Sequence, residues 1–228
     1  MTTPACRPLR RRFGLAGIAV LAGCAGGPPP PDWQSNAKAA IDGAVQASLS
    51  GDSRLEAQEF ERARSELART GRPDWVARAE LMRCAAHTAS LAFDPCEGFE
   101  RLRPDAAAAE RAYADHLAGR ALPPDDVARL PPAQRETAAA IAGGSVPPGS
   151  LQAIDDPLSR LIAAALLFRA GKASPEMITL AADTASAQGW RRPLLAWLQV
   201  QALRAERVGA ADEAQRLRRR IELVQGGQ

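Results

Sequence analysis

The amino-acid sequence predicts an all-α protein. Only 4% of the residues are aromatic and β-branched residues are also sparse, so few side chains favour strands. Alanine is abundant, and apolar residues recur with a period near 3.6, which is the spacing of one face of a helix. Glycines, prolines and capping residues divide the chain into segments of helical length, and these signals predict where each helix begins and ends.

Glycine and proline mark the first three predicted helices. Gly51 should end the first, and Gly71 with Pro73 should separate the second from the third. Ser53 and Glu56 have the spacing of a capping box, in which each side chain bonds to a backbone amide at the start of the second helix. The predicted helices span residues 36–51, 53–70 and 74–92.

Three capping side chains stand directly before a proline, in the pairs Asp94-Pro95, Asp156-Pro157 and Ser174-Pro175. Such a pair is typical of a helix start, because the side chain caps the first turn and proline has no amide to leave unpaired. The last four predicted helices span residues 157–170, 175–188, 193–208 and 211–225. Residues 97–150 should be less regular: 106–119 should be helical, and paired prolines cut the rest into short pieces.

Small residues and glycines have a repeated spacing at the two ends of the chain. Ala44 lies seven residues before Gly51, and Ala202 lies seven before Gly209. An apolar residue on each return helix completes the pattern that tight antiparallel helices require. The spacing resembles that of tetratricopeptide repeats, with Glu56 standing where that family prefers alanine. The alternatives are a degenerate stack of such helical hairpins and a plain alanine-rich bundle.

The N-terminal residues 1–23 have the order of a secretory signal. The basic run Arg10-Arg11-Arg12 precedes an apolar run of about 11 residues and then a small-residue region. This apolar run is too short for a membrane span, which needs roughly 20 residues. Residues 24–35, with four consecutive prolines, should form an extended tether to a helical domain at 36–228.

Leu21-Ala22-Gly23-Cys24 resembles the lipobox of bacterial lipoproteins. That resemblance implies that Cys24 becomes the lipidated first residue of the mature protein. Ala25, in place of aspartate, implies retention at the outer membrane, with the domain on the periplasmic face, and the inner membrane is the alternative location.

The net charge of +3 belongs largely to the segment before Cys24. That segment holds four arginines and no acid, and its removal leaves 25 basic against 26 acidic residues. The basic whole-chain balance is therefore no indication of nucleic-acid binding, and we expect none.

Cys84 and Cys96 remain after the signal and lipid cysteines are set aside. In an oxidising periplasm two such residues should pair as a disulfide. A metal site is the alternative, because His87 follows Cys84 on the same predicted helical face and Asp94 lies near Cys96. The spacing matches no complete zinc pattern, so we expect neither metal nor cofactor.

Few residues suggest chemistry. No serine-hydrolase, zinc-protease or phosphate-loop motif occurs in the sequence. His116 stands alone and should be solvated, whereas Trp75 and Trp197 should be core residues. Trp190, next to Arg191 and Arg192 at a turn, could be half exposed, and these three residues are the candidate partner surface.

These observations predict a non-enzymatic, lipid-anchored periplasmic adaptor or assembly protein that presents a helical surface to an envelope protein or peptide. The alternative is an envelope enzyme that acts on peptidoglycan through a glutamic acid. A pocket holding a glutamate with a raised pKa would favour the enzyme.

Overall fold

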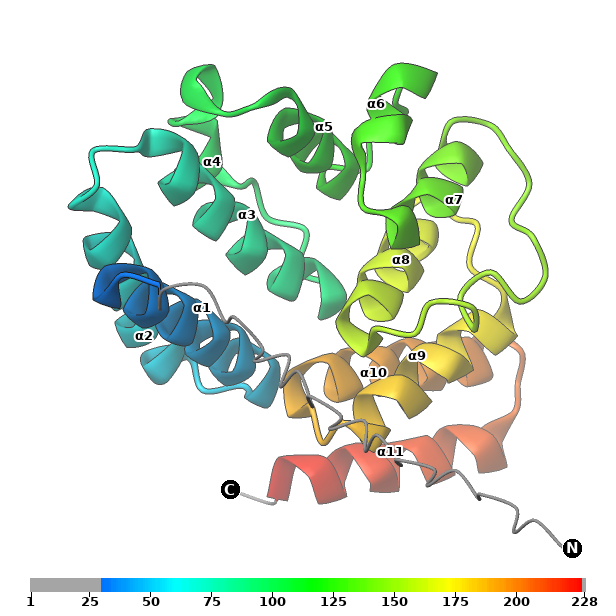
Figure 1. The fold of residues 1–228 in the computed structure, drawn as a ribbon. Helices are drawn as coiled ribbons and strands as arrows, with labels where there is room; N and C mark the ends of the chain where they lie inside the picture. The colour runs from blue at the N-terminus through cyan, green and yellow to red at the C-terminus, as the bar shows by residue number, and fades with distance from the viewer. Residues whose placement is uncertain (1–29, 227–228) are drawn as a thin grey trace, which may run out of the picture. The chain divides into compact units, whose positions relative to one another are not determined.

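A computed structural model of the chain describes residues 30–226, which contain eleven α-helices, one short 3-10 helix and no β-strand (Figure 1). The helical unit starts at Pro31. The elements are α1 (Asp32–Ser50), α2 (Ser53–Ala68), α3 (Pro73–Ala89), α4 (Glu97–Glu100), η1 (Arg103–Asp105), α5 (Ala108–Leu117), α6 (Pro124–Arg129), α7 (Pro132–Ile141), α8 (Pro157–Arg169), α9 (Pro175–Ala187), α10 (Arg191–Arg207) and α11 (Ala211–Gly226). The all-α prediction is confirmed. None of these helices is long and apolar enough to cross a membrane.

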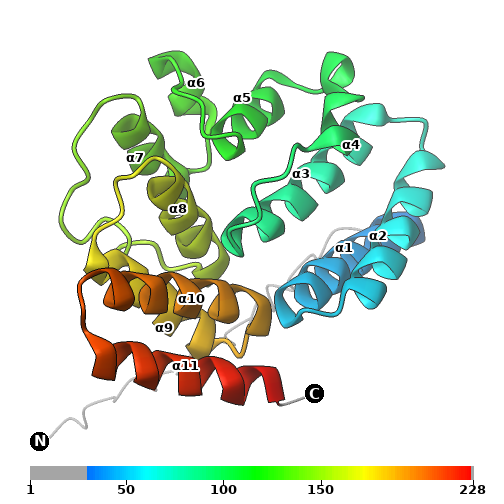
Figure 2. The same ribbon diagram turned by 180° about the vertical axis from the view of Figure 1, so that it is seen from behind.

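Helical hairpins occur at both ends of the helical unit. Helices α1 and α2 form the first, and Gly51 ends α1 with a φ of 89° that suits glycine. Helices α10 and α11 form the last, with Gly209 at the turn and a φ of 72° (Figures 1 and 2). Ala44 and Ala202 are both buried, as the hairpin spacing predicts. The arrangement is compatible with a helical-repeat-like fold.

Helix α8 supplies the centre of the main core. Every residue from Leu161 to Leu167 is buried, which reflects the continuous apolar run of this helix. Helix α8 packs against α3, α7 and α9. Trp197 of α10 is fully buried, packs edge-to-face on Phe168, and donates its indole N–H to the backbone oxygen of Ala89. These contacts join α3 to the C-terminal helices.

Two of the three capping residues that stand before a proline cap their helices as predicted. Asp156 accepts a hydrogen bond from the amide of Ser159, and Ser174 accepts one from the amide of Met177. The prediction for Asp94 was wrong, because the next helix begins at Glu97 and its N-cap is Cys96. The third helix also ends earlier than predicted, at Ala89.

Helix α1 begins at Asp32, inside the segment predicted to be tether. Pro31 precedes the first turn, and Asp32 there favours the helix through its negative charge near the positive helix end. The ring of Trp33 lies 4.8 Å from that of Trp75, centroid to centroid, so tertiary packing holds this turn. The predicted signal and Cys24 lie outside the described residues.

The middle of the chain is built from short helices, as the proline pairs predict. Helices α6 and α7 each begin with a proline in the first turn. His116 of α5 is fully buried, so the prediction of a solvated histidine was wrong. Its Nε2–H donates to Oε1 of Gln134 at 3.2 Å, and the amide of Gln134 in turn donates to the backbone oxygen of Ser159.

Candidate functional site

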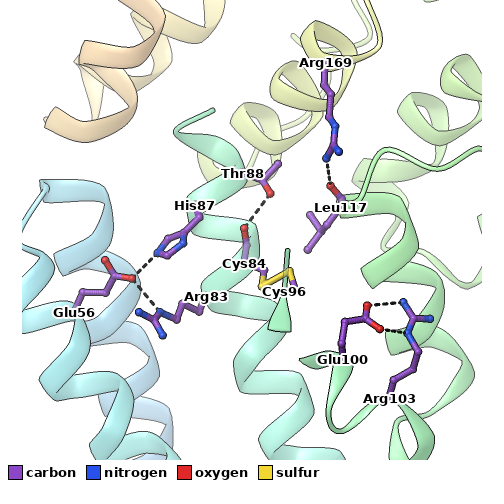
Figure 3. The surroundings of a disulfide bond; sticks show 10 residues. All are labelled: Glu56, Arg83, Cys84, His87, Thr88, Cys96, Glu100, Arg103, Leu117 and Arg169. Atoms are coloured by element: carbon purple, nitrogen blue, oxygen red, sulfur yellow. Dashed lines mark hydrogen bonds and ion pairs between the residues drawn. A yellow bond between two sulfur atoms is a disulfide. The ribbon is translucent and has the colours of Figure 1, made fainter. Parts of the chain in front are cut away.

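A buried carboxylate joins the consecutive helices α2 and α3 to α10, which lies far from them in the sequence. Glu56 of α2 accepts hydrogen bonds from Arg83 at 3.2 Å and from His87 at 2.5 Å, both of them on α3 (Figure 3). Its second oxygen accepts a hydrogen bond from Nη1 of Arg192 on α10 at 2.9 Å. We call these four residues the Glu56 cluster. Only 4% of the Glu56 side chain is exposed.

The surroundings of Glu56 keep it ionised. Burial alone would raise the pKa of its carboxyl, because a charge is poorly solvated inside a protein. Hydrogen bonds from His87 and Arg192, with the positive charge around them, outweigh burial and lower the pKa from 4.5 to about 2. The cluster therefore acts as an ionic clamp between the N-terminal hairpin, α3 and α10.

The capping box predicted at Ser53 and Glu56 does not form. The N-cap of α2 is Asp52, whose carboxylate accepts the amide of Leu55 at 2.9 Å. Ser53 instead accepts a hydrogen bond from Nη2 of Arg192 at 2.7 Å. Both residues that suggested a local cap are therefore bound by one arginine from the other end of the chain.

Beside this clamp lies an open pocket of about 370 Å³, which we call the α10 pocket. One side comes from the α1–α2 turn and the end of α3, through Gly51, Ser53 and Ser90. The other side comes from the start of α10, through Arg191, Arg192, Leu195, Ala196 and Gln199. The pocket thus combines two guanidinium groups, two hydroxyls and an amide with a small apolar area.

Two of the three predicted partner residues line the α10 pocket. Arg191 donates from Nε to the backbone oxygen of Val224 and forms no ion pair within residues 30–226. Arg192 also lines the pocket, but Glu56, which it shares with Arg83, compensates part of its charge. Trp190 is only 9% exposed and packs in the main core, so the prediction of a half-exposed ring was wrong. The N-cap position holds its backbone at the start of α10, and its apolar ring points to the core.

Cys84 and Cys96 lie together as the predicted disulfide, with a Cα–Cα distance of 5.9 Å (Figure 3). The pair joins α3 to the segment that leads into α4. His87, the third residue of the metal alternative, points toward Glu56 on α2. Among the described residues no group of three or more potential metal ligands comes together.

A catalytic glutamic acid should combine a raised pKa with access to substrate. Burial raises the pKa of Glu80, although the positive charge of Arg64, which donates a hydrogen bond to it, acts to lower that pKa. Glu80 does not line the α10 pocket. It also lines neither the pocket of about 310 Å³ beside Glu110 nor the pocket of about 490 Å³ beside Glu136.

Sequence reasoning found Arg191 and Arg192 but missed the Glu56 cluster. A signal was present, because Glu56 is charged where the hairpin spacing requires a small residue. A carboxylate at a buried position needs cationic partners, and the adjacent Arg191-Arg192 pair was a candidate source. Arg83 gave no comparable signal.

No protein-family model, curated protein or solved structure matches the chain. The function of the site is therefore inferred from its own geometry and chemistry.

Proposed function

We propose that the protein is a lipid-anchored adaptor of the bacterial envelope that binds another envelope protein through the α10 pocket and its surroundings. The observation that carries this proposal is the meeting of Arg191 and Arg192 with the α1–α2 turn around an open, polar-rimmed pocket. Arg192 binds both Glu56 and Ser53, so these two polar side chains of the pocket, Arg192 and Ser53, are held in place without a ligand.

The resemblance of Leu21-Ala22-Gly23-Cys24 to a lipobox supports the anchor. A lipid at Cys24 confines the domain to one membrane surface, which raises its effective concentration toward other envelope components. A modest affinity at the pocket is then sufficient for function. The Cys84–Cys96 pair supports the same location, because disulfides persist in the oxidising periplasm.

Mass spectrometry of the protein extracted from bacterial membranes tests the anchor. The wild-type chain should begin at Cys24 and carry acyl chains, and Cys24→Ala should remain unprocessed. An unmodified, soluble wild-type product would exclude the anchor.

Site-specific photo-crosslinking in the envelope tests the adaptor function. A photoreactive residue is placed at Gln199, an exposed residue of the α10 pocket, or at Gln215, an exposed residue of α11. We expect a discrete crosslinked product from position 199 that is absent from position 215. The product should also weaken when Arg191→Gln is added. Identical products from both positions would contradict a partner site at the pocket.

A further inference from the structure

The charges around the α10 pocket do not cancel. Arg192 is paired at 2.9 Å with Glu56, but Glu56 also pairs with Arg83, so this carboxylate compensates only part of the charge of Arg192. Arg191 donates to a backbone oxygen, which leaves its positive charge without a carboxylate partner in the described chain. Within residues 30–226, Arg191 therefore adds to the pocket rim a positive charge that no carboxylate pairs with.

Two further polar side chains of the pocket can donate hydrogen bonds to a ligand. Ser53 already accepts from Arg192, so its hydroxyl proton is free to donate to another acceptor. The amide of Gln199 is exposed and can donate as well. A guanidinium, a hydroxyl and an amide together suit a carboxylate, which only accepts hydrogen bonds when ionised.

The pocket also has an apolar part. Leu195 and Ala196 are partly buried and lie on α10 between Arg191 and Gln199. A volume of about 370 Å³ exceeds what one carboxylate group fills, so the occupant should bring apolar atoms with its acid.

We infer that the α10 pocket binds an acidic segment of the partner protein, with a side-chain carboxylate on Arg191 and a neighbouring apolar side chain on Leu195 and Ala196. The inference rests on the proposed adaptor function and specifies the chemistry of the partner. Arg191 is the anion-binding residue, whereas Arg192 positions the pocket by holding Ser53 and Glu56.

Fluorescence polarisation with a fluorescein-labelled peptide of alternating glutamate and leucine tests the inference on the full chain in detergent. The matched peptide has glutamine in place of glutamate. We expect the acidic peptide to bind and the glutamine peptide to bind at least about tenfold more weakly, since charge-assisted hydrogen bonds are the strong ones. Arg191→Gln should weaken binding of the acidic peptide by a similar factor, and Arg191→Lys should restore most of it.

Arg219→Gln provides the matched control, because Arg219 is exposed on α11 and does not line the pocket. This variant should bind the acidic peptide within about twofold of wild type, because exposed charges beyond the contact are screened. A second pair of variants tests the pocket without changing Arg191. Gln199→Glu should weaken binding of the acidic peptide, and Gln215→Glu on α11 should not.

Three outcomes would overturn the inference: equal binding of the two peptides, equal losses from Arg191→Gln and Arg219→Gln, or displacement of the peptide by vesicles containing phosphatidylglycerol. The last would assign the pocket to an anionic membrane surface. Loss of acid selectivity leaves the adaptor proposal intact, because crosslinking from Gln199 tests that proposal separately.

Discussion

Replacement of Glu56 by glutamine should make the stability of the protein less dependent on pH. The side chain is 4% exposed and its pKa is lowered from 4.5 to about 2 by its partners in the fold. Each tenfold difference between folded and unfolded proton affinity corresponds to about 1.4 kcal/mol, so the ionised carboxylate contributes roughly 3 kcal/mol to folding at neutral pH.

The sign follows from the lowered pKa. The folded protein prefers the ionised form of Glu56, so the contribution is complete above pH 4.5 and disappears as the pH falls through about 2. Glu56→Gln keeps the size and one acceptor oxygen but removes the charge. It should reduce the free energy of unfolding by roughly 3 kcal/mol at pH 7, and the difference from wild type should close as the pH approaches 2.

Urea unfolding followed by circular dichroism, at several pH values with the disulfide intact, measures this difference. Glu61→Gln is the control, since Glu61 is exposed on the same helix and forms no ion pair in the described structure. Its substitution should change stability by less than about 0.5 kcal/mol. A difference between Glu56→Gln and wild type that stayed constant from pH 7 to pH 2 would refute the electrostatic reasoning.

Three further variants test other contacts. Burial lowers the pKa of His116 to about 4, so stability should fall as the pH drops from 6.5 to 4, and His116→Gln should remove that component in urea unfolding. Replacing Cys84 and Cys96 together by serine should cost about 2–4 kcal/mol, a loss that a reductant should reproduce in wild type. Ala202→Leu should overpack the main core at α10 and lower stability by about 1–3 kcal/mol. Ala211→Leu, at an exposed site, should be nearly neutral, and thermal melts measure both variants.

Helix boundaries could be predicted from the sequence wherever the signal is local. The caps at Asp156 and Ser174 lie next to their prolines, and each accepts an amide three residues ahead. Gly209 likewise ends its hairpin helix by its own backbone conformation. Such interactions depend on a few neighbouring residues, so a single sequence contains them.

The Glu56 cluster could not be predicted in this way. Ser53 and Glu56 satisfy a local capping pattern, yet Asp52 caps the helix and leaves both side chains free for Arg192. Arg192 lies 136 residues from Glu56 along the chain, so its approach depends on the packing of α10 against α1. His116 was misjudged for a related reason, because its partner Gln134 comes from a separate short helix.

Arg192 belongs both to the ionic clamp and to the α10 pocket. Loss of Glu56 should therefore lower the stability of the protein and strengthen its binding of an acidic peptide. Glu56→Gln removes the charge that compensates Arg192, so the α10 pocket would then hold two uncompensated guanidinium groups. Although the variant is less stable, it should bind the acidic peptide more tightly than wild type at neutral pH and low salt, because attraction grows with the charge of the site.

The measurement is the same polarisation assay, made well below the melting temperature of the variant, with Glu61→Gln as the unchanged control. Added salt should reduce the gain, because it screens the second guanidinium. Unchanged or weaker binding by folded Glu56→Gln would show that Arg192 does not act on the ligand. The site would then depend on Arg191 alone, and the clamp would serve only to hold α2 and α3 against α10.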